Sequence, residues 1–172
     1  MPPGSEIDPQ KLRTIVRQAF NYELLDNFEW HITPLGSDAG NPTSAGVYRI
    51  AGSADASGEQ VAWSLILKIF QSPANLGKEN LGEGDDPTHW NYWKREFYIF
   101  QSDWLSHLPA GLAAPQCYAA YELPGNFGAL WLEDIHDSYA HNWSLSQYAN
   151  IARALGRLNG QYLADPTLPH HP

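Results

Sequence analysis

Hydrophobic positions along the chain follow a helical period in some segments and a strand period in others. After Asp8 and Pro9, which suit the cap and first position of a helix, apolar residues recur every three or four positions and predict a helix near residues 8–25. Five later segments rich in β-branched and aromatic residues predict strands at 30–35, 45–51, 61–70, 116–123 and 129–135. Polar and glycine-containing stretches separate them at lengths that fit the hairpins of an antiparallel sheet.

Two further helices follow from the same period. Thr88 suits the cap of a helix in which aromatic residues recur at spacings of three and four, at Trp90, Trp93, Phe97, Phe100 and Trp104. On a helical wheel these residues fall within about 80° and form a narrow stripe. A last helix is predicted near residues 144–163. Residues 71–87 have hardly any apolar side chains and predict a mobile acidic loop at the surface.

The predicted order is helix, three strands, helix, two strands, helix. It indicates an α+β fold with a five-stranded antiparallel sheet, because a doubly wound parallel sheet needs strands and helices in alternation. An arrangement of two interleaved small layers is the alternative.

Charge and cysteine content exclude several classes of protein. The 172 residues carry 10 Lys and Arg against 19 Asp and Glu, a net charge of −9, which disfavours binding to nucleic acid or to an anionic membrane surface. Cys117 is the one cysteine, so the chain forms no internal disulfide and no cysteine-based zinc site. The first residues lack the pattern of a secretory signal, and the longest apolar run, 63–70, contains Lys68. We therefore expect a cytoplasmic protein that does not span a membrane.

The third predicted strand carries a lysine in an otherwise apolar run. Strand alternation puts the odd-numbered residues of 61–69 on one face, and Lys68 lies on the other face between Ile66 and Phe70. Two interpretations fit this lysine. It is either half-buried beside a charged partner, or a residue of an edge strand whose amine extends into water.

Glu96 is the candidate partner of Lys68. On the wheel of the aromatic helix it lies at the border of the stripe, where it can face the sheet, and we expect the two side chains to meet within salt-bridge distance. Lys94 and Arg95 are predicted to be surface charges. The alternative for Glu96 is an ordinary solvated glutamate on a helix face.

The chain resembles the amino-terminal lobe of the aminoglycoside phosphotransferase family, which has the protein-kinase-like fold. The resemblance rests on an ordered set of segments over residues of about 28–163: LILKIF with its lysine, YWKREFYIF with its glutamate, LWLEDI, and YANIARALGRLNGQYL. It implies that residues 1–27 are an N-terminal helix, 28–136 a kinase-like lobe with the acidic loop 71–87, and 137–172 the exit from a hinge and a helix leading to a carboxy-terminal lobe.

The resemblance also implies roles for particular residues. Lys68 would bind the α- and β-phosphates of ATP, and Glu96 would position it through an ion pair. Backbone groups of a hinge would hold the adenine, at Leu132, Glu133, Asp134 and Ile135. The segment LGSDAGNPTSAGVYRI does not have the glycine spacing of the kinase phosphate loop. Phosphate contacts would come instead from Ser37, Asn41 and Ser44, for which plain turn residues are the alternative interpretation.

The sequence departs from the family in its catalytic half. None of the seven histidines begins the His-x-Asp-x-x-x-x-Asn loop that positions the acceptor hydroxyl and Mg²⁺ in this fold. Asp85 and Asp86 lie in the acidic loop and are expected to be solvated, with metal binding as the alternative. Glu133, Asp134, His136 and Asp137 are not expected to converge on a metal, because consecutive residues at a strand end point in alternating directions. The expected protein is thus an ATP-binding lobe of a kinase whose complete form would use ATP and Mg²⁺ to phosphorylate a hydroxyl of a small molecule. The chain alone is expected to be inactive.

A second hypothesis comes from a different class of protein. Seven Trp residues suit a non-catalytic binding module on the same scaffold, with exposed aromatic side chains that contact a partner, a second copy or a carboxy-terminal lobe.

Overall fold

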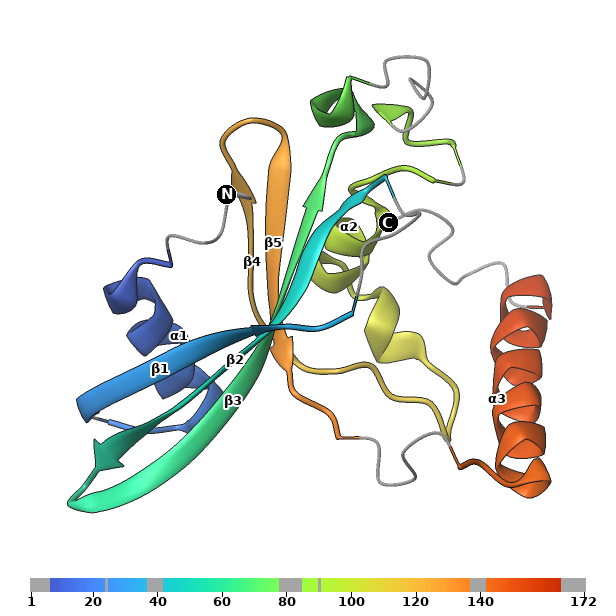
Figure 1. The fold of residues 1–172 in the computed structure, drawn as a ribbon. Coiled ribbons are helices and arrows are strands. Elements are labelled where there is room, and N and C mark those ends of the chain that lie inside the picture. The colour runs from blue at the N-terminus through green and yellow to red at the C-terminus, as the bar shows by residue number, and fades with distance from the viewer. Residues whose placement is uncertain are drawn as a thin grey trace. The chain divides into compact units, whose positions relative to one another are not determined.

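The protein is described by a computed structural model that covers residues 7–23, 25–36, 42–77, 85–89, 91–136 and 142–164. Figure 1 shows its elements in chain order: α1 (Pro9–Phe20), β1 (Asp26–Pro34), β2 (Ser44–Ala56), β3 (Glu59–Gln71), η1 (Pro73–Leu76), α2 (Arg95–Gln101), η3 (Trp104–His107), β4 (Cys117–Leu123), β5 (Phe127–Glu133) and α3 (Leu145–Ala164). The predicted α+β class with a five-stranded antiparallel sheet is confirmed.

The sheet has the order β1-β2-β3-β5-β4, and all neighbouring strands are antiparallel. The β2–β3 hairpin turns through Ser57 and Gly58, whose φ angles of 52° and 87° are both positive. Such a turn matches the right-handed twist of long paired strands. After β3 the chain leaves the sheet through α2, forms the edge strand β4, and returns through β5 beside β3. This order makes β3 a central strand, so the edge-strand interpretation of Lys68 does not hold.

The core lies between α1 and one face of the sheet. Leu12 and Val16 of α1 are fully buried against apolar side chains of β2, β3 and β5. The contribution of β3 consists of its odd-numbered residues, of which Leu65 is 0% exposed. The predicted alternation of β3 is therefore confirmed, and Lys68 points to the face away from α1.

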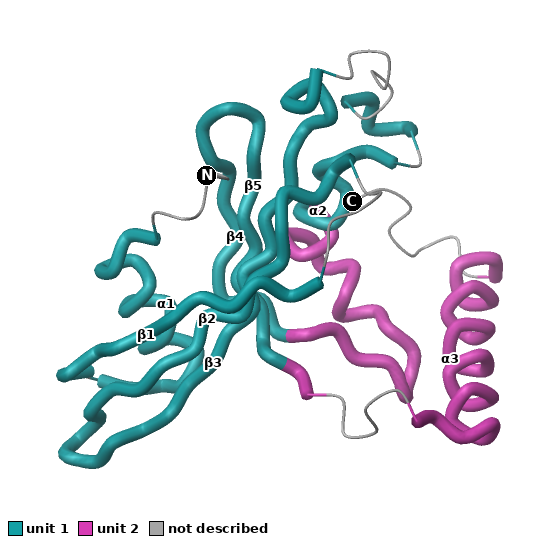
Figure 2. The backbone as a smooth tube through the Cα atoms, in the orientation of Figure 1, with its two compact units in different colours: residues 1–97, 116–134 teal, residues 98–115, 135–172 magenta. Residues whose placement is uncertain are grey.

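The chain divides into two compact units, shown in different colours in Figure 2. The first contains residues 1–97 and 116–134, and with them α1 and the sheet. The second contains residues 98–115 and 135–172, in which Trp104 stacks on Tyr162 of α3 with ring centroids 5.1 Å apart. None of the described helices is long and apolar enough to cross a membrane.

The predicted aromatic helix is much shorter than its periodicity indicates. Thr88 does not cap it: both its N–H and its hydroxyl donate to the Asp86 side chain at 2.8 Å, and Asn91 N donates to His89 Nδ1 at 3.2 Å. These side-chain bonds hold residues 86–89 in turns that compete with a helix, and α2 starts only at Arg95. Trp90, also assigned to this helix, lies outside the described residues.

Other element boundaries also differ from the prediction: β1 begins at Asp26 and not at residue 30, and β2 continues to Ala56 and not only to residue 51. α1 ends at Phe20 and not near residue 25, because Asn21 adopts the left-handed conformation that terminates helices. The expected loop 71–87 begins with buried Gln71 and Ser72 and continues as η1. Ser72 and Trp93 both donate to the Asp85 carboxylate, at 3.0 and 2.7 Å, so Asp85 joins this segment to the lead-in of α2.

Truncation of one buried leucine tests whether the core between α1 and the sheet stabilises the first unit. Leu65→Ala removes a side chain that is 0% exposed, and we expect a loss of about 2–5 kcal/mol in the free energy of unfolding. Leu76→Ala, at a side chain that is 45% exposed, is the control and should stay within about 0.5 kcal/mol of the parent. Denaturant titration followed by circular dichroism measures both. Equal losses in the two variants would contradict this assignment of the core.

Candidate functional site

The candidate site begins with Lys68 in the middle of β3. The residue pairs with Val47 of β2 on one side and Leu130 of β5 on the other, so its strand neighbours are apolar. Its side chain is 29% exposed. A half-buried ammonium in apolar surroundings needs a partner of opposite charge.

An aromatic contact holds the start of α2 over this face of the sheet. The ring of Phe70, next to Lys68 on the same face, lies 5.8 Å from the ring of Trp93 and 5.7 Å from that of Phe97. All three rings are buried. Opposite Phe70, β5 has Gly128, where a Cβ atom would come within 2.2 Å of the Phe70 ring. The glycine therefore makes room for the ring that anchors α2.

This anchoring places Glu96, the second residue of α2, beside Lys68. Lys68 Nζ donates a hydrogen bond to Glu96 Oε2. The glutamate side chain is 42% exposed, so the pair is partly open to solvent. A pair of this kind adds little to stability, but it fixes the direction of the lysine side chain.

The two basic residues before Glu96 are not the free surface charges that the wheel predicts. Lys94 Nζ forms an ion pair with Glu122 of β4 at 2.8 Å, and its side chain is only 20% exposed. Arg95 donates through Nη2 to the carbonyl oxygen of His89 at 2.5 Å. Both residues secure the lead-in of α2, one to the sheet and one to the preceding turn.

A second ion pair lies further along the face that carries Lys68. Arg49 of β2 binds Asp134 in two places, with Nε to Oδ2 at 2.7 Å and Nη2 to Oδ1 at 3.0 Å. The Asp134 side chain is 3% exposed and that of Arg49 37%. Hydrogen bonding to Asp134, followed by attraction to its charge, raises the pKa of Arg49, so the guanidinium stays charged.

The Arg49–Asp134 pair fixes the exit of β5 to the sheet. Arg49 is paired in register with Ile66, and Ile66 with Leu132, so the guanidinium reaches past β3 to the residue that follows β5. Sequence reasoning missed this contact. The available signal was similar to that for Lys68: Arg49 is the single charged residue of the predicted strand 45–51.

The four predicted hinge residues lie at the end of β5 and directly after it. Leu132 is buried and is paired with Ile66 and Cys117 within the sheet. The N–H of Glu133 donates to Gln116 O at 2.9 Å. Asp134 is the first residue after β5, and the boundary between the two units falls between it and Ile135, whose side chain is 61% exposed.

The predicted phosphate contacts are only partly described. Ser37 and Asn41 lie outside the described residues. Ser44 is the first residue of β2 and is paired with Phe70, and its carbonyl oxygen accepts a hydrogen bond from Gln71 at 3.4 Å. The structure thus brings Lys68 and Glu96 together and places Ser44 at the Phe70 end of their face. The described residues contain no group of three metal-binding side chains.

A pocket of about 370 Å³ opens where β5 ends and β3 continues. Its lining contains aromatic rings, small residues of β3 and the two acidic residues at the exit of β5: Phe20, Ala62, Trp63, Ser64, Tyr118, Glu133 and Asp134. Burial, followed by the charge of Glu133, raises the pKa of Tyr118, so its phenol stays protonated at neutral pH. Lys68 does not line this pocket.

Removal of Arg49 alone should be more harmful than removal of both members of its ion pair. Arg49→Met removes the guanidinium that binds the nearly buried Asp134 carboxylate, whereas the double variant Arg49→Met with Asp134→Asn removes the charge of the carboxylate as well. We expect a lower melting temperature for the single variant than for the double variant. Thermal unfolding near pH 7 measures the difference, and a double variant less stable than the single variant would contradict this reading of the pair.

Comparison of the chain with models of protein families, with curated proteins and with solved structures gave no match in any of the three.

Proposed function

We propose that the unit of residues 1–97 and 116–134 binds ATP on the sheet face that carries Lys68. In this proposal it is the nucleotide-binding part of a small-molecule phosphotransferase similar to the aminoglycoside phosphotransferases. The observation that carries the proposal is the ion pair between Lys68 on the third strand and Glu96 on the helix that follows. Protein kinases place a lysine on the third strand and a glutamate on the next helix, and the lysine contacts the nucleotide phosphates.

The electrostatics of the pair support a phosphate ligand. A lysine ammonium has three N–H donors, and Glu96 accepts from one of them. The glutamate holds the amine in place while the other two donors remain for phosphate oxygens. Partial exposure of the lysine, at 29%, keeps this side of the amine within reach of a ligand.

The surroundings of Lys68 support a flat apolar group beside the phosphates. Val47 and Ile66 form a partly exposed apolar surface on the same face, next to Leu130 and Leu132 of β5, which are buried. An adenine ring would pack on this surface with its polar edge toward the backbone of Asp134. The Arg49 guanidinium, fixed by Asp134, would border the base.

The fit to Mg²⁺ is poor in the part of the chain that the structure describes. That part holds no cluster of three possible metal ligands, and the sequence lacks the His-x-Asp-x-x-x-x-Asn loop. Mg²⁺ and the small-molecule acceptor therefore remain elements of the proposed complete enzyme, and no catalytic step is assigned to the described residues.

A second candidate function is supported by the surface of α3. Large apolar side chains are exposed along this helix, with Leu145 at 88% and Leu163 at 89% and three more between them: Tyr148, Ile151 and Leu155. Exposed apolar patches usually mark contact surfaces. An interaction module built on the same scaffold would use this surface and would not need a nucleotide.

Nucleotide binding separates the two candidates. We expect ATP to bind the full chain, and Lys68→Met to weaken the binding roughly 10- to 100-fold, because a hydrogen bond to a charged group contributes about 1.5–3 kcal/mol. Lys11→Met is the control: it removes the same charge on the opposite side of the sheet from Lys68, and ATP binding should stay close to that of the parent. Isothermal titration calorimetry measures the three proteins.

Two outcomes would count against the ATP proposal. If both substitutions weaken ATP binding equally, the affinity for ATP depends only on the net charge of the protein. Absence of ATP binding to the folded parent chain would leave the interaction module as the better account.

A further inference from the structure

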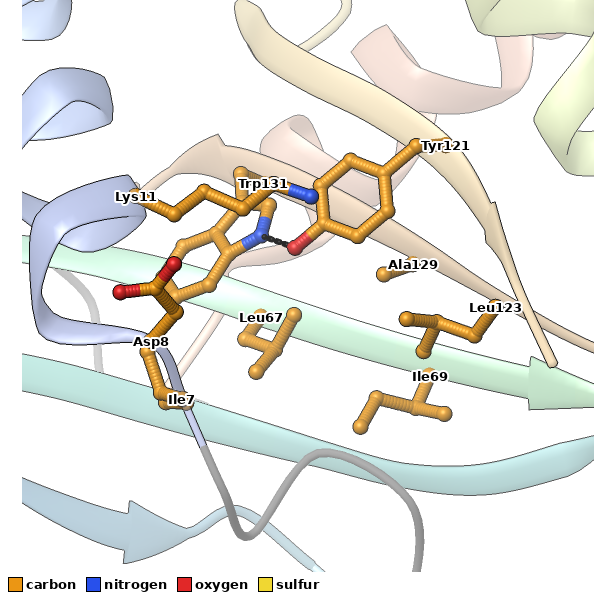
Figure 3. A pocket seen from close by; sticks show the side chains of 9 residues that line it. All are labelled: Ile7, Asp8, Lys11, Leu67, Ile69, Tyr121, Leu123, Ala129 and Trp131. Carbon is orange, nitrogen blue, oxygen red and sulfur yellow. Dashed lines mark hydrogen bonds between the residues drawn. The ribbon is translucent and has the colours of Figure 1, made fainter.

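A pocket of about 280 Å³ lies on the opposite side of the sheet from Lys68, beneath the start of α1. Figure 3 shows its lining, which comes from α1, from the two residues before it and from three strands: Ile7, Asp8, Lys11, Leu67, Ile69, Tyr121, Leu123, Ala129 and Trp131. Its volume is close to the lower end for small-molecule sites, so it suits a small ligand. Because the pocket and Lys68 lie on different faces of β3, an inference about the pocket does not rest on the proposed nucleotide site.

The floor of the pocket is apolar. Leu67 and Ile69 of β3 and Ala129 of β5 are 3%, 1% and 1% exposed, and Leu123 of β4 closes the same side. The small Ala129 side chain lies between these larger residues in Figure 3. A ligand would therefore place an apolar group against this floor.

One part of the rim offers hydrogen-bond donors. Lys11 Nζ lies 3.0 Å from the centroid of the Tyr121 ring, and within the described part of the chain it has no ion pair or hydrogen bond. Tyr121 Oη accepts a hydrogen bond from Trp131 Nε1 at 2.8 Å, as Figure 3 shows, which leaves its own O–H to donate. An ammonium and a phenol next to each other suit a carboxylate group.

Another part of the rim offers an acceptor. Asp8 accepts from the N–H of Gln10 through Oδ1 at 2.9 Å and so caps α1. Its second oxygen, Oδ2, has no hydrogen bond to any other described residue. The rim therefore presents charges of both signs above a single apolar floor: Asp8 at the N-cap of α1 and Lys11 in its first turn.

We propose that this pocket binds a free amino acid with an apolar side chain. Lys11 and Tyr121 bind its carboxylate, Asp8 binds its ammonium, and the side chain packs on Leu67, Ile69 and Ala129. A fatty acid has a carboxylate that Asp8 would repel and no ammonium to offset this repulsion. An alkyl amine has an ammonium that Lys11 would repel and no carboxylate to offset it. A zwitterion satisfies both ends of the rim.

The test titrates the full chain with leucine, methionine and phenylalanine, and with two compounds that lack one charge of leucine. These are 4-methylpentanoate, without the ammonium, and 3-methylbutylamine, without the carboxylate. We expect at least one of the three amino acids to bind. For leucine we expect roughly tenfold tighter binding than for either truncated compound, from one charged hydrogen bond lost.

Two variants of rim residues test which side chain binds the carboxylate of leucine and which binds its ammonium. Lys11→Met should bind leucine no better than the parent binds 3-methylbutylamine. Asp8→Asn should bind leucine no better than the parent binds 4-methylpentanoate, and asparagine retains the helix cap because it is as good an N-cap residue as aspartate. Lys94→Met and Asp26→Asn, at positions outside the pocket, are controls of equal charge change and should leave leucine binding unaltered.

The outcomes decide the proposal in either direction. It is overturned if none of the three amino acids binds the folded chain, if either truncated compound binds as tightly as leucine, or if the rim variants bind like the control variants. Because both rim residues are exposed, a loss of fold in these variants is not expected, and circular dichroism checks it.

Discussion

The need of one half-buried ammonium for a partner is the constraint on which the proposed site depends. Lys68 lies in a central strand between apolar neighbours, and Glu96 supplies the opposite charge. Glu96 reaches it only because α2 starts over the same face, held there by the packing of Phe70 against Trp93 and Phe97. The aromatic residues thus explain the position of the helix, and the helix explains the ion pair.

β3 separates two environments that serve different purposes. Its odd-numbered side chains complete the core beneath α1 and form part of the floor of the small pocket, and its even-numbered side chains form the face with Lys68. A substitution on one side therefore tests one proposal with little direct effect on the other. The Arg49–Asp134 pair adds a second fixed point on the Lys68 face, at the exit of β5.

Local periodicity was sufficient to predict most of the fold. The strands, the two faces of β3 and the candidate partner of Lys68 all follow from residue spacing, because a pleated strand and a helix impose periods of their own. The prediction failed where a side chain competes with the backbone. Asp86 binds Thr88 and keeps the aromatic segment from becoming helical before residue 95, although its aromatic spacing is that of a helix.

Contacts between residues distant in the sequence were beyond such reasoning. Arg49 and Asp134 are 85 positions apart, and the pocket joins Lys11 to Tyr121 through a sheet order that exchanges β4 and β5. A single sequence contains no register between strands, so neither the second ion pair nor the pocket could be predicted from it. The pairing of Lys68 with Glu96 could be predicted because it needs only the alternation of one strand and the helical wheel of the next helix along the chain.

The most direct test of the account is to identify which lysine lies beside the phosphates of a bound nucleotide. An acyl phosphate of ATP transfers its acyl group to a lysine amine near the phosphates, forming an amide and releasing ATP, and peptide mass spectrometry then locates the modified residue. We expect Lys68 to be labelled, excess ATP to suppress this labelling, and the labelling of Lys94 not to respond to ATP. Labelling of Lys68 that excess ATP leaves unchanged, or ATP-sensitive labelling only at another lysine, would contradict the ATP proposal.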